Sequence, residues 1–165
     1  MSHFIMLCGL PGTGKSTYIK LLNQQLRGYD KRDATVISSD NILELIGNEY
    51  GLIYNDIFGD ISYSFAERMM YKVAEKVFER EDRTIVWDQT NLTVKSRAKK
   101  LAMVPEHYWK EAIIFNPPLD HHDRLRKRAL TEGKLIPWDV LASMNSRFVK
   151  PTHAEGFDSV IEMTM

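Results

Sequence analysis

The segment from Gly9 to Thr17 reads GLPGTGKST and directly follows a short apolar run. It fits the pattern G-x-x-x-x-G-K-[ST], which binds nucleotide phosphates where it joins a strand to a helix. Glycines let backbone N–H groups converge on phosphate oxygens, and the following helix adds the positive end of its dipole. This segment therefore predicts a phosphate-binding loop, or P-loop, for a nucleoside triphosphate.

Two side chains of this loop have chemistry of their own. Lys15 is expected to bridge the β- and γ-phosphates, and Ser16 is expected to ligate Mg²⁺. The predicted nucleotide-binding residues of the loop are Gly9, Pro11, Gly12, Thr13, Gly14, Lys15, Ser16 and Thr17. Phosphate binding alone fits switches, motors and kinases alike, so other residues must decide the reaction.

Two later apolar runs each end in an aspartate, namely Asp40 and Asp88. The run that ends in Asp88 has the form of a Walker B carboxylate, which supports the metal in P-loop enzymes. Asp40 could instead cap a helix that begins at Asn41, and Asp88 could be a solvated turn residue. Phosphoryl transfer needs a base for the acceptor hydroxyl and a metal for the phosphates, and two carboxylates beside one P-loop meet both needs.

Cations for the transferred phosphoryl group are expected in the basic run from His121 to Arg128. Arg124 and Arg128 stand four residues apart and share one face of a predicted helix, although such runs are often only solvated surface. In P-loop kinases, the helical pair before the last strand carries a lid whose arginines fold over the phosphates and exclude water. We place this lid at about residues 119–137. Arg97 is a further cation that could face the cleft or solvent.

The pattern of apolar residues predicts the elements that must position these groups. Short runs rich in Ile, Val or Phe predict strands at 3–8, 34–38, 84–87, 111–115 and 159–163. Longer patterns predict helices at 15–26, 41–46, 61–81, 94–103, 119–131 and 137–148. Alternation of strand and helix predicts an α/β three-layer sandwich of the P-loop NTPase type, with a parallel sheet of about five strands. Ligands gather at the carboxyl ends of such strands, so the loops there should share one cleft.

Length and composition limit the class of protein. A chain of 165 residues with 44% hydrophobic and 27% charged residues predicts one globular domain over residues 1–165. Its 22 Lys and Arg balance 22 Asp and Glu, which argues against non-specific electrostatic binding to nucleic acid. A single cysteine excludes an internal disulfide and a Cys-rich metal site. No run is long enough for a membrane span or the core of a signal peptide, so we expect a cytoplasmic protein.

These elements together resemble the 5′-kinase domain of polynucleotide kinases, both the bacteriophage enzyme and the animal kinase/phosphatase, within the wider set of P-loop kinases. The resemblance runs nearly from end to end: GLPGTGKST, the strand closing on Asp40, DQTN followed by Ser96-Arg97, Arg128 ahead of Ile136-Pro137, and Pro151-Thr152 with Ala154-Glu155-Gly156-Phe157. The P-loop is widespread, whereas D-x-T-N and P-T-x-A-E-G-F in this order are much narrower.

The resemblance implies an ATP-dependent polynucleotide 5′-hydroxyl kinase in which Asp40 is the general base. Lys15 and Arg128 would be catalytic with it, and Lys15 and Ser16 would handle ATP and Mg²⁺. It also implies that Asp88, Thr90 and Asn91 organise the acceptor side, and that Arg97, grouped with them as a substrate-binding residue, supports that loop. The expected partner is then a DNA or RNA end with a free 5′-hydroxyl, and no membrane.

The chain departs from the family pattern on the acceptor side and in the lid. The viral relatives carry arginine beside and shortly after the catalytic Asp, where it meets the acceptor phosphate, but Ser39 and Leu43 stand here. Acceptor binding is therefore expected to differ. A second lid arginine is expected shortly after Arg128, so Arg126 or Lys134 would have to replace it at the nucleotide.

Three classes of function are compatible with these motifs. The first is the polynucleotide kinase, and the alternative is a small-molecule kinase acting on a nucleoside, nucleotide, sugar or antibiotic. The third is a nucleotide-dependent switch, which Asp40 disfavours because a switch needs no base for an alcohol, and no N-K-x-D string indicates GTP. Neutral net charge suits a small acceptor slightly better, whereas D-Q-T-N and P-T-H-A-E-G-F favour a nucleic-acid end.

Overall fold

The computed structural model describes residues 2–29, 32–50, 63–79 and 84–165. The strands among these residues are β1 (His3–Cys8), β2 (Thr35–Ile37), β3 (Thr84–Asp88), β4 (Trp109–Phe115) and β5 (Ser159–Met163). They form one sheet in the order β2-β3-β1-β4-β5, and every neighbouring pair is parallel. The predicted α/β architecture with a five-stranded parallel sheet is confirmed.

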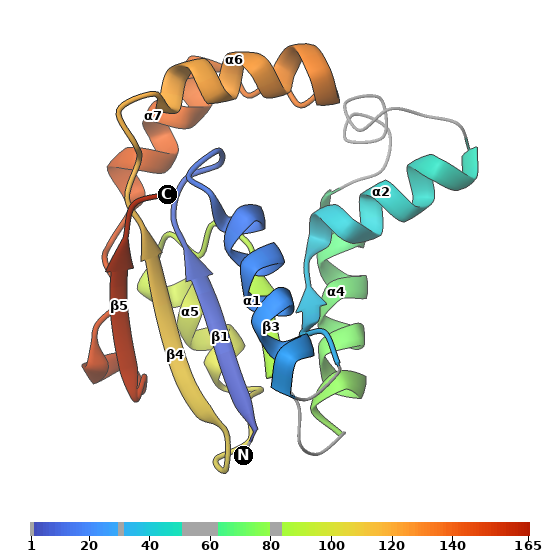
Figure 1. Ribbon diagram of the computed structural model, residues 1–165, viewed down its shortest axis with the longest axis vertical. Coiled ribbons are helices and arrows are strands. Elements are labelled where there is room, and N and C mark those ends of the chain that lie inside the picture. Colours follow the sequence, from blue (N-terminus) through green and yellow to red (C-terminus); the bar gives the residue numbers. More distant parts are fainter. Residues whose placement is uncertain (1, 30–31, 51–62, 80–83) are drawn as a thin grey trace.

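Helices cover both faces of this sheet (Figure 1). They are α1 (Lys15–Tyr29), α2 (Ser39–Tyr50), α4 (Tyr63–Phe78), α5 (Val94–Leu101), α6 (His121–Glu132) and α7 (Trp138–Arg147), with a short 3₁₀ turn η1 (His153–Glu155). Successive residues of a strand face opposite sides. Phe4 and Met6 of β1 therefore pack with Met70 of α4 on one side, while Ile5 packs with Leu22 of α1 on the other.

Several boundaries differ from those predicted, and one difference matters for the chemistry. α2 begins at Ser39, so Asp40 lies in the first turn of the helix and not in the loop before it. The prediction ended this helix at residue 46, but α2 runs through Gly47 and Asn48 to Tyr50. Glycine and asparagine lower helix propensity without forbidding a helix, which is why they are weak stop signals.

The predicted lid corresponds to α6 and the segment that returns from it to α7, and it lies over the carboxyl ends of the strands (Figure 1). The ring of His122 at the start of α6 stacks on Trp138 at the start of α7, with centroids 4.6 Å apart. The returning segment 133–137 therefore runs back along α6.

The lid shares an apolar cluster with the loops beneath it. Buried Leu10 of the P-loop, Leu92 of the loop after β3 and Leu141 of α7 form this cluster, and Leu125 of α6 packs against it. The start of the lid is therefore fixed to the P-loop. Among the described residues, no helix combines the length and the apolar composition needed to span a bilayer.

Candidate active site

The P-loop between β1 and α1 takes a shape that only its glycines allow. Gly12 and Gly14 have φ values of 78° and 102°, in the left-handed region that L side chains rarely adopt. A Cβ on Gly9 would lie 2.7 Å from the main-chain oxygen of Phe115, so the loop passes very close to the end of β4. The N–H of Gly9 donates to the main-chain oxygen of Thr90 at 2.9 Å, which ties the loop to the segment after β3.

Lys15 holds its ammonium group inside this loop. Nζ donates to the main-chain oxygens of Gly9 at 3.0 Å and Leu10 at 2.7 Å. Burial lowers the pKa of Lys15 to about 8, while the negative charges of Asp88 and Asp40 act to raise it. A cation that is short of solvent and near several carbonyls is well suited to receive a phosphate.

Among the other side chains of the loop, one stabilises it from inside and two are exposed to solvent. Thr13 is buried and donates from Oγ1 to the main-chain oxygen of Leu10 at 2.8 Å, so its side chain stabilises the loop. Ser16 and Thr17 are exposed at the start of α1. The hydroxyl of Ser16 is therefore accessible for the predicted magnesium contact.

The outer side of the P-loop contacts the first turns of α6. Nε2 of buried His121 donates to the main-chain oxygen of Pro11 at 2.7 Å. A Cβ on Gly12 would lie 2.9 Å from Leu125, so this glycine also permits a close approach of the lid helix. This contact cannot be predicted from the sequence, because a histidine at a helix start gives no signal of a partner over a hundred residues away.

Two carboxylates lie near Lys15 at the same edge of the sheet. Asp40 is half-buried in the first turn of α2, and Asp88 is half-buried at the end of β3. Burial raises the pKa of Asp88. The positive charge of Lys15 acts to lower this pKa, and the negative charge of Asp40 acts to raise it. The structure thus brings together the predicted base, the predicted Walker B carboxylate and the P-loop lysine.

Cations of the lid reach this group of charges. The positive charge of Arg128 acts to lower the pKa of both Lys15 and Asp88. Nε of Arg128 also lies 3.2 Å from Oε2 of Glu132. Lys134 follows the end of α6, and its charge also acts on the pKa of Asp88. Arg126, which was the other candidate for the second lid cation, is exposed on α6.

Arg124 shares a helical face with Arg128 but has a different environment. Its Nε lies 2.9 Å from Asp120, and its Nη1 donates to the main-chain oxygen of Met165 at 2.7 Å. Met165 in turn lies close to Gly14, because a Cβ on that glycine would be 2.7 Å from the Cβ of Met165. The last residues of the chain therefore pack between α6 and the P-loop.

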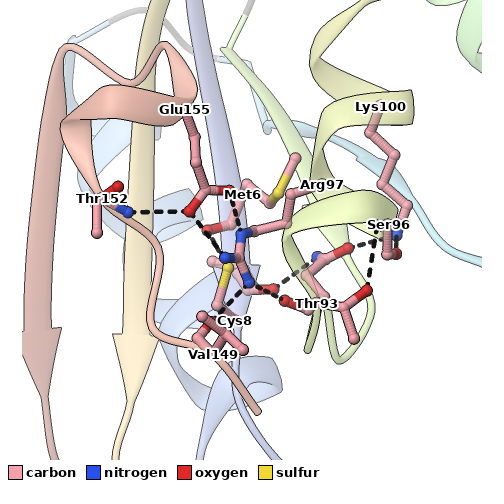
Figure 2. Close-up of polar contacts among 11 residues, drawn as sticks. Met6, Cys8, Thr93, Ser96, Arg97, Lys100, Val149, Thr152 and Glu155 are labelled. Carbon is pink, nitrogen blue, oxygen red and sulfur yellow. Dashed lines mark hydrogen bonds and ion pairs between the residues drawn. The ribbon is translucent and has the colours of Figure 1, made fainter. Parts of the chain in front are cut away.

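Arg97 is fully buried and contacts three other segments of the chain (Figure 2). Nε and Nη2 donate to the carboxylate of Glu155 at 2.7 and 2.8 Å. Nη1 donates to the main-chain oxygens of Asn91 at 3.0 Å and Val149 at 2.8 Å. Arg97 therefore faces the protein interior, where its guanidinium supports the loop after β3, as the resemblance implied, rather than contacting an acceptor directly.

Asn91 is buried as well, with 1% of its surface exposed. Its Nδ2 donates to the main-chain oxygen of Leu7 at 2.7 Å, and its Oδ1 accepts a hydrogen bond from Nζ of Lys100. Burial lowers the pKa of Lys100 to about 8. Asn91 has a positive φ of 47°, a conformation that asparagine tolerates better than most residues. The predicted acceptor contact by its side chain is thus also corrected to a supporting role.

The hydrogen bonds that join Arg97 to Asn91, Val149 and Glu155 form the Arg97 network. The sequence element P-T-H-A-E-G-F supplies the carboxylate of this network. The N–H of Thr152 donates to Glu155 at 3.1 Å, and the two residues form a capping box around η1. Phe157 is buried in the core beside β1. The motif therefore places the Glu155 carboxylate against Arg97 (Figure 2).

Gln89 is a site residue that sequence reasoning missed. Its Nε2 donates to Oγ of Ser39 at 3.0 Å, and its Oε1 accepts a hydrogen bond from Nε1 of Trp87 at 3.2 Å. The side chain thus joins the end of β3 to the first residue of α2, next to Asp40. Its only sequence signal was its place between Asp88 and Thr90. Thr90 itself is half-buried in the structure.

Comparison with known proteins places this arrangement in a family. A family model described as an AAA domain, AAA_33, matches residues 4–151. The chain belongs to the AAA_33 family. The fold around its glycine loop is that of a P-loop kinase-like domain, and such a loop implies nucleotide binding.

Solved structures share the fold of this AAA_33 domain at low sequence identity. Kti12 of Chaetomium thermophilum, in complex with ADP-AlF3, has a TM-score of 0.67 at 12% identity, covering 98% of this chain and 88% of that chain. A candidate kinase of Chloroflexus aurantiacus j-10-fl has a TM-score of 0.65 at 17% identity, covering 98% and 84%. A gluconokinase of Sinorhizobium meliloti 1021 has a TM-score of 0.53 at 12% identity, covering 97% and 81%.

Proposed function

We propose that this AAA_33 domain transfers the γ-phosphoryl group of ATP to a hydroxyl group of a small molecule. The observation that carries the proposal is the meeting of Lys15, Asp40 and Asp88 at one edge of the sheet, beside the glycine loop. A nucleotide switch has no need of a second carboxylate there. A kinase needs one, because the acceptor hydroxyl must lose its proton.

The described residues fit ATP and Mg²⁺. The glycine loop has the close backbone approach that phosphate binding uses, and Lys15 supplies a cation within it. The Ser16 hydroxyl and the Asp88 carboxylate are oxygen donors, which Mg²⁺ prefers. When bound, the metal neutralises negative charge on the transferring phosphates.

The proposed reaction is an in-line transfer in which the side chains position and neutralise the reacting groups. Asp40 accepts the proton of the acceptor hydroxyl as its oxygen forms a bond to the γ-phosphorus. The bond from that phosphorus to the bridging oxygen breaks, and its electron pair leaves with ADP. Lys15 and Arg128 balance the negative charge, which is the main protein contribution in such loose transition states.

A small acceptor is favoured because the motifs that suggested nucleic acid make internal contacts. Asn91, Arg97 and Glu155 carry the D-Q-T-N and P-T-H-A-E-G-F resemblance, and all three bind other parts of the protein. Such contacts serve any acceptor equally. A gluconokinase is among the proteins that share the fold, and the net charge of the chain is zero.

A 5′-hydroxyl end of DNA or RNA is the second candidate acceptor. The order of the motifs along the chain resembles polynucleotide kinases, and this order is the observation that favours it. In either case Asp40 would serve as the base for the same type of alcohol.

A labelled-ATP assay over a panel of acceptors tests the proposal. The panel holds sugars, amino sugars, nucleosides, mononucleotides, and 5′-hydroxyl DNA and RNA. Label on a small molecule is the expected result, whereas label on oligonucleotides alone would transfer the assignment to the second candidate. No labelled product from any acceptor would overturn the kinase proposal.

A pair of matched variants separates catalysis from helix stabilisation. Asp40 and Asp139 are both acidic residues in the first turn of a helix. Asp40→Ala should lower turnover by about 10² to 10⁴-fold, the usual contribution of general acid/base catalysis. Asp139→Ala should leave turnover unchanged. Equal turnover of both variants, with both folded, would remove Asp40 from the mechanism.

A further inference from the structure

We infer that the acceptor carries no negative charge near its reacting hydroxyl, and that Glu44 selects for this property. The acceptor class is then a neutral or positively charged hydroxyl compound, such as a sugar or an amino sugar. This inference rests on the proposed function and names its substrate class.

Glu44 lies one helical turn after Asp40 on α2, so the two carboxylates share a face of that helix. Glu44 forms an ion pair with Lys134, which follows the left-handed Gly133 at the end of α6. The face of α2 that carries Asp40 is therefore directed toward the end of the lid helix.

The ion pair lies beside the reacting groups and is partly shielded from solvent. The positive charge of Lys134 acts to lower the pKa of Asp88, so Lys134 lies within electrostatic range of that carboxylate. The side chain of Lys134 is 18% exposed and that of Glu44 is 46% exposed. Glu44 thus stands where α2 and the lid meet, with its carboxylate still accessible from solvent.

The described start of α2, from Ser39 to Leu45, presents no cation to an acceptor. Ser39 is buried, and Leu43 is fully buried against Ala66 of α4, so the positions where viral relatives carry arginine present nothing to an acceptor phosphate. Over residues 33–45 the sequence has no lysine or arginine and has three acidic residues. No positive charge can come from this stretch of chain.

An anionic acceptor would therefore meet two carboxylates on α2 and a lysine that Glu44 already neutralises. Lys15 and Arg128 are committed to the phosphates of the nucleotide in the proposed mechanism. Repulsion of the wrong ligand is a common source of specificity, since an unfavourable charge contact discriminates without any new attractive contact. A neutral hydroxyl or an ammonium group can instead donate hydrogen bonds to Glu44.

The test compares pairs of acceptors that differ only by a phosphate. Each pair consists of a 5′-hydroxyl nucleoside with its 3′-monophosphate, or a sugar with its phosphate ester. The measured quantity is the ratio of kcat/KM between the two members, which removes effects common to both. It is determined for the wild type, Glu44→Lys, Glu44→Gln and Lys134→Met, with Glu106→Lys as an exposed control far from the site.

The wild type should prefer the uncharged member of each pair. Glu44→Lys should shift the ratio toward the phosphorylated member by at least about tenfold, and Glu44→Gln should shift it less, in the same direction. Lys134→Met should shift the ratio the opposite way, because it leaves Glu44 without its counter-charge. Glu106→Lys should leave the ratio unchanged.

The failures of the two proposals give different results. A wild type that prefers the phosphorylated members, or a ratio that does not respond to Glu44→Lys, would overturn this inference and leave the kinase assignment in place. A wild type that labels neither member of any pair, nor any other acceptor in the panel, would overturn the kinase assignment itself.

Discussion

Lys15 has to remain charged in a place where burial opposes charge. Burial lowers the pKa of its ammonium group to about 8 in the nucleotide-free protein. A lysine is charged below its pKa, so the fraction that can bind phosphate falls as the pH rises through 8. A bound triphosphate raises this pKa again, because opposite charge favours the protonated form.

We therefore predict that ATP binding near pH 8 takes up a proton and weakens above that pH, by up to tenfold per pH unit. Calorimetry in buffers of different ionisation enthalpy measures the number of protons taken up. Lys15→Met should abolish the part of the uptake centred near pH 8. An unchanged uptake in this variant would assign the proton to another group.

Gln89 places the end of β3 relative to the start of α2 through two side-chain hydrogen bonds. Gln89→Leu should lower kcat by about tenfold, with little change in the KM for ATP, because Asp40 loses its fixed position. The lost hydrogen bonds should lower the free energy of unfolding by about 1 to 3 kcal/mol. Exposed Gln24 on α1 provides the control, since Gln24→Leu should change neither quantity.

A double-mutant cycle distinguishes this positioning role from a general loss of stability. Ser39→Ala should reproduce the fall in kcat, and the double variant should fall no further than Gln89→Leu alone. Additive losses would show that the contact between the two side chains does not transmit the effect.

At the scale of elements, Arg97 connects α5 to three segments that the sequence separates widely. Its guanidinium binds the loop after β3, the segment after α7 and η1. Arg97→Met should lower the free energy of unfolding by about 3 to 5 kcal/mol, because it leaves the largely buried carboxylate of Glu155 without its cationic partner. Urea denaturation measures the loss.

Two further variants check the cause of that loss. Replacing Glu155 by Leu in the Arg97→Met background should restore part of the stability, because no unpaired charge then remains. Arg147 is exposed on α7, and Arg147→Met should change the free energy of unfolding by less than about 0.5 kcal/mol. A loss in the Arg147 variant as large as that in the Arg97 variant would contradict this account.

The elements themselves could largely be predicted from the sequence, whereas the partners of several charged residues could not. Apolar runs locate the strands because the central strands β1, β3 and β4 are buried on both faces. A charged residue on a helix such as α5 gives no comparable signal. From the sequence, Arg97 could face the cleft or solvent, and its partner Glu155 stands 58 positions away. The second lid cation was ambiguous for the same reason, because only folding brings Lys134 close to Asp88.

At the scale of the whole molecule, Cys8 gives access to the global stability. It is the only cysteine, is fully buried at the end of β1, and has a pKa raised to about 12 by burial. Thiol reagents need the thiolate, so the folded protein should react only when it opens.

We predict that ATP slows the labelling of Cys8 by a thiol reagent. At an ATP concentration of 100 times Kd, ATP binding stabilises the folded state by about 2.7 kcal/mol. Where the labelling rate depends on the population of the open form, this slows labelling roughly a hundredfold. Lys15→Ala should lose this protection while keeping slow labelling without nucleotide. Rapid labelling of the native wild type would contradict the burial of Cys8.

Among the side chains that the structure describes, the Arg97 network joins its loops without using α2. Asn41, Glu44 and Leu45 are exposed on that helix, and none of them belongs to the network. Under the proposed function, the exposed α2 positions that would recognise an acceptor can therefore change while the residues that form the P-loop stay fixed. A directed-evolution library restricted to these three positions would explore new acceptors at little risk to folding, and natural relatives with different substrates are open to the same route.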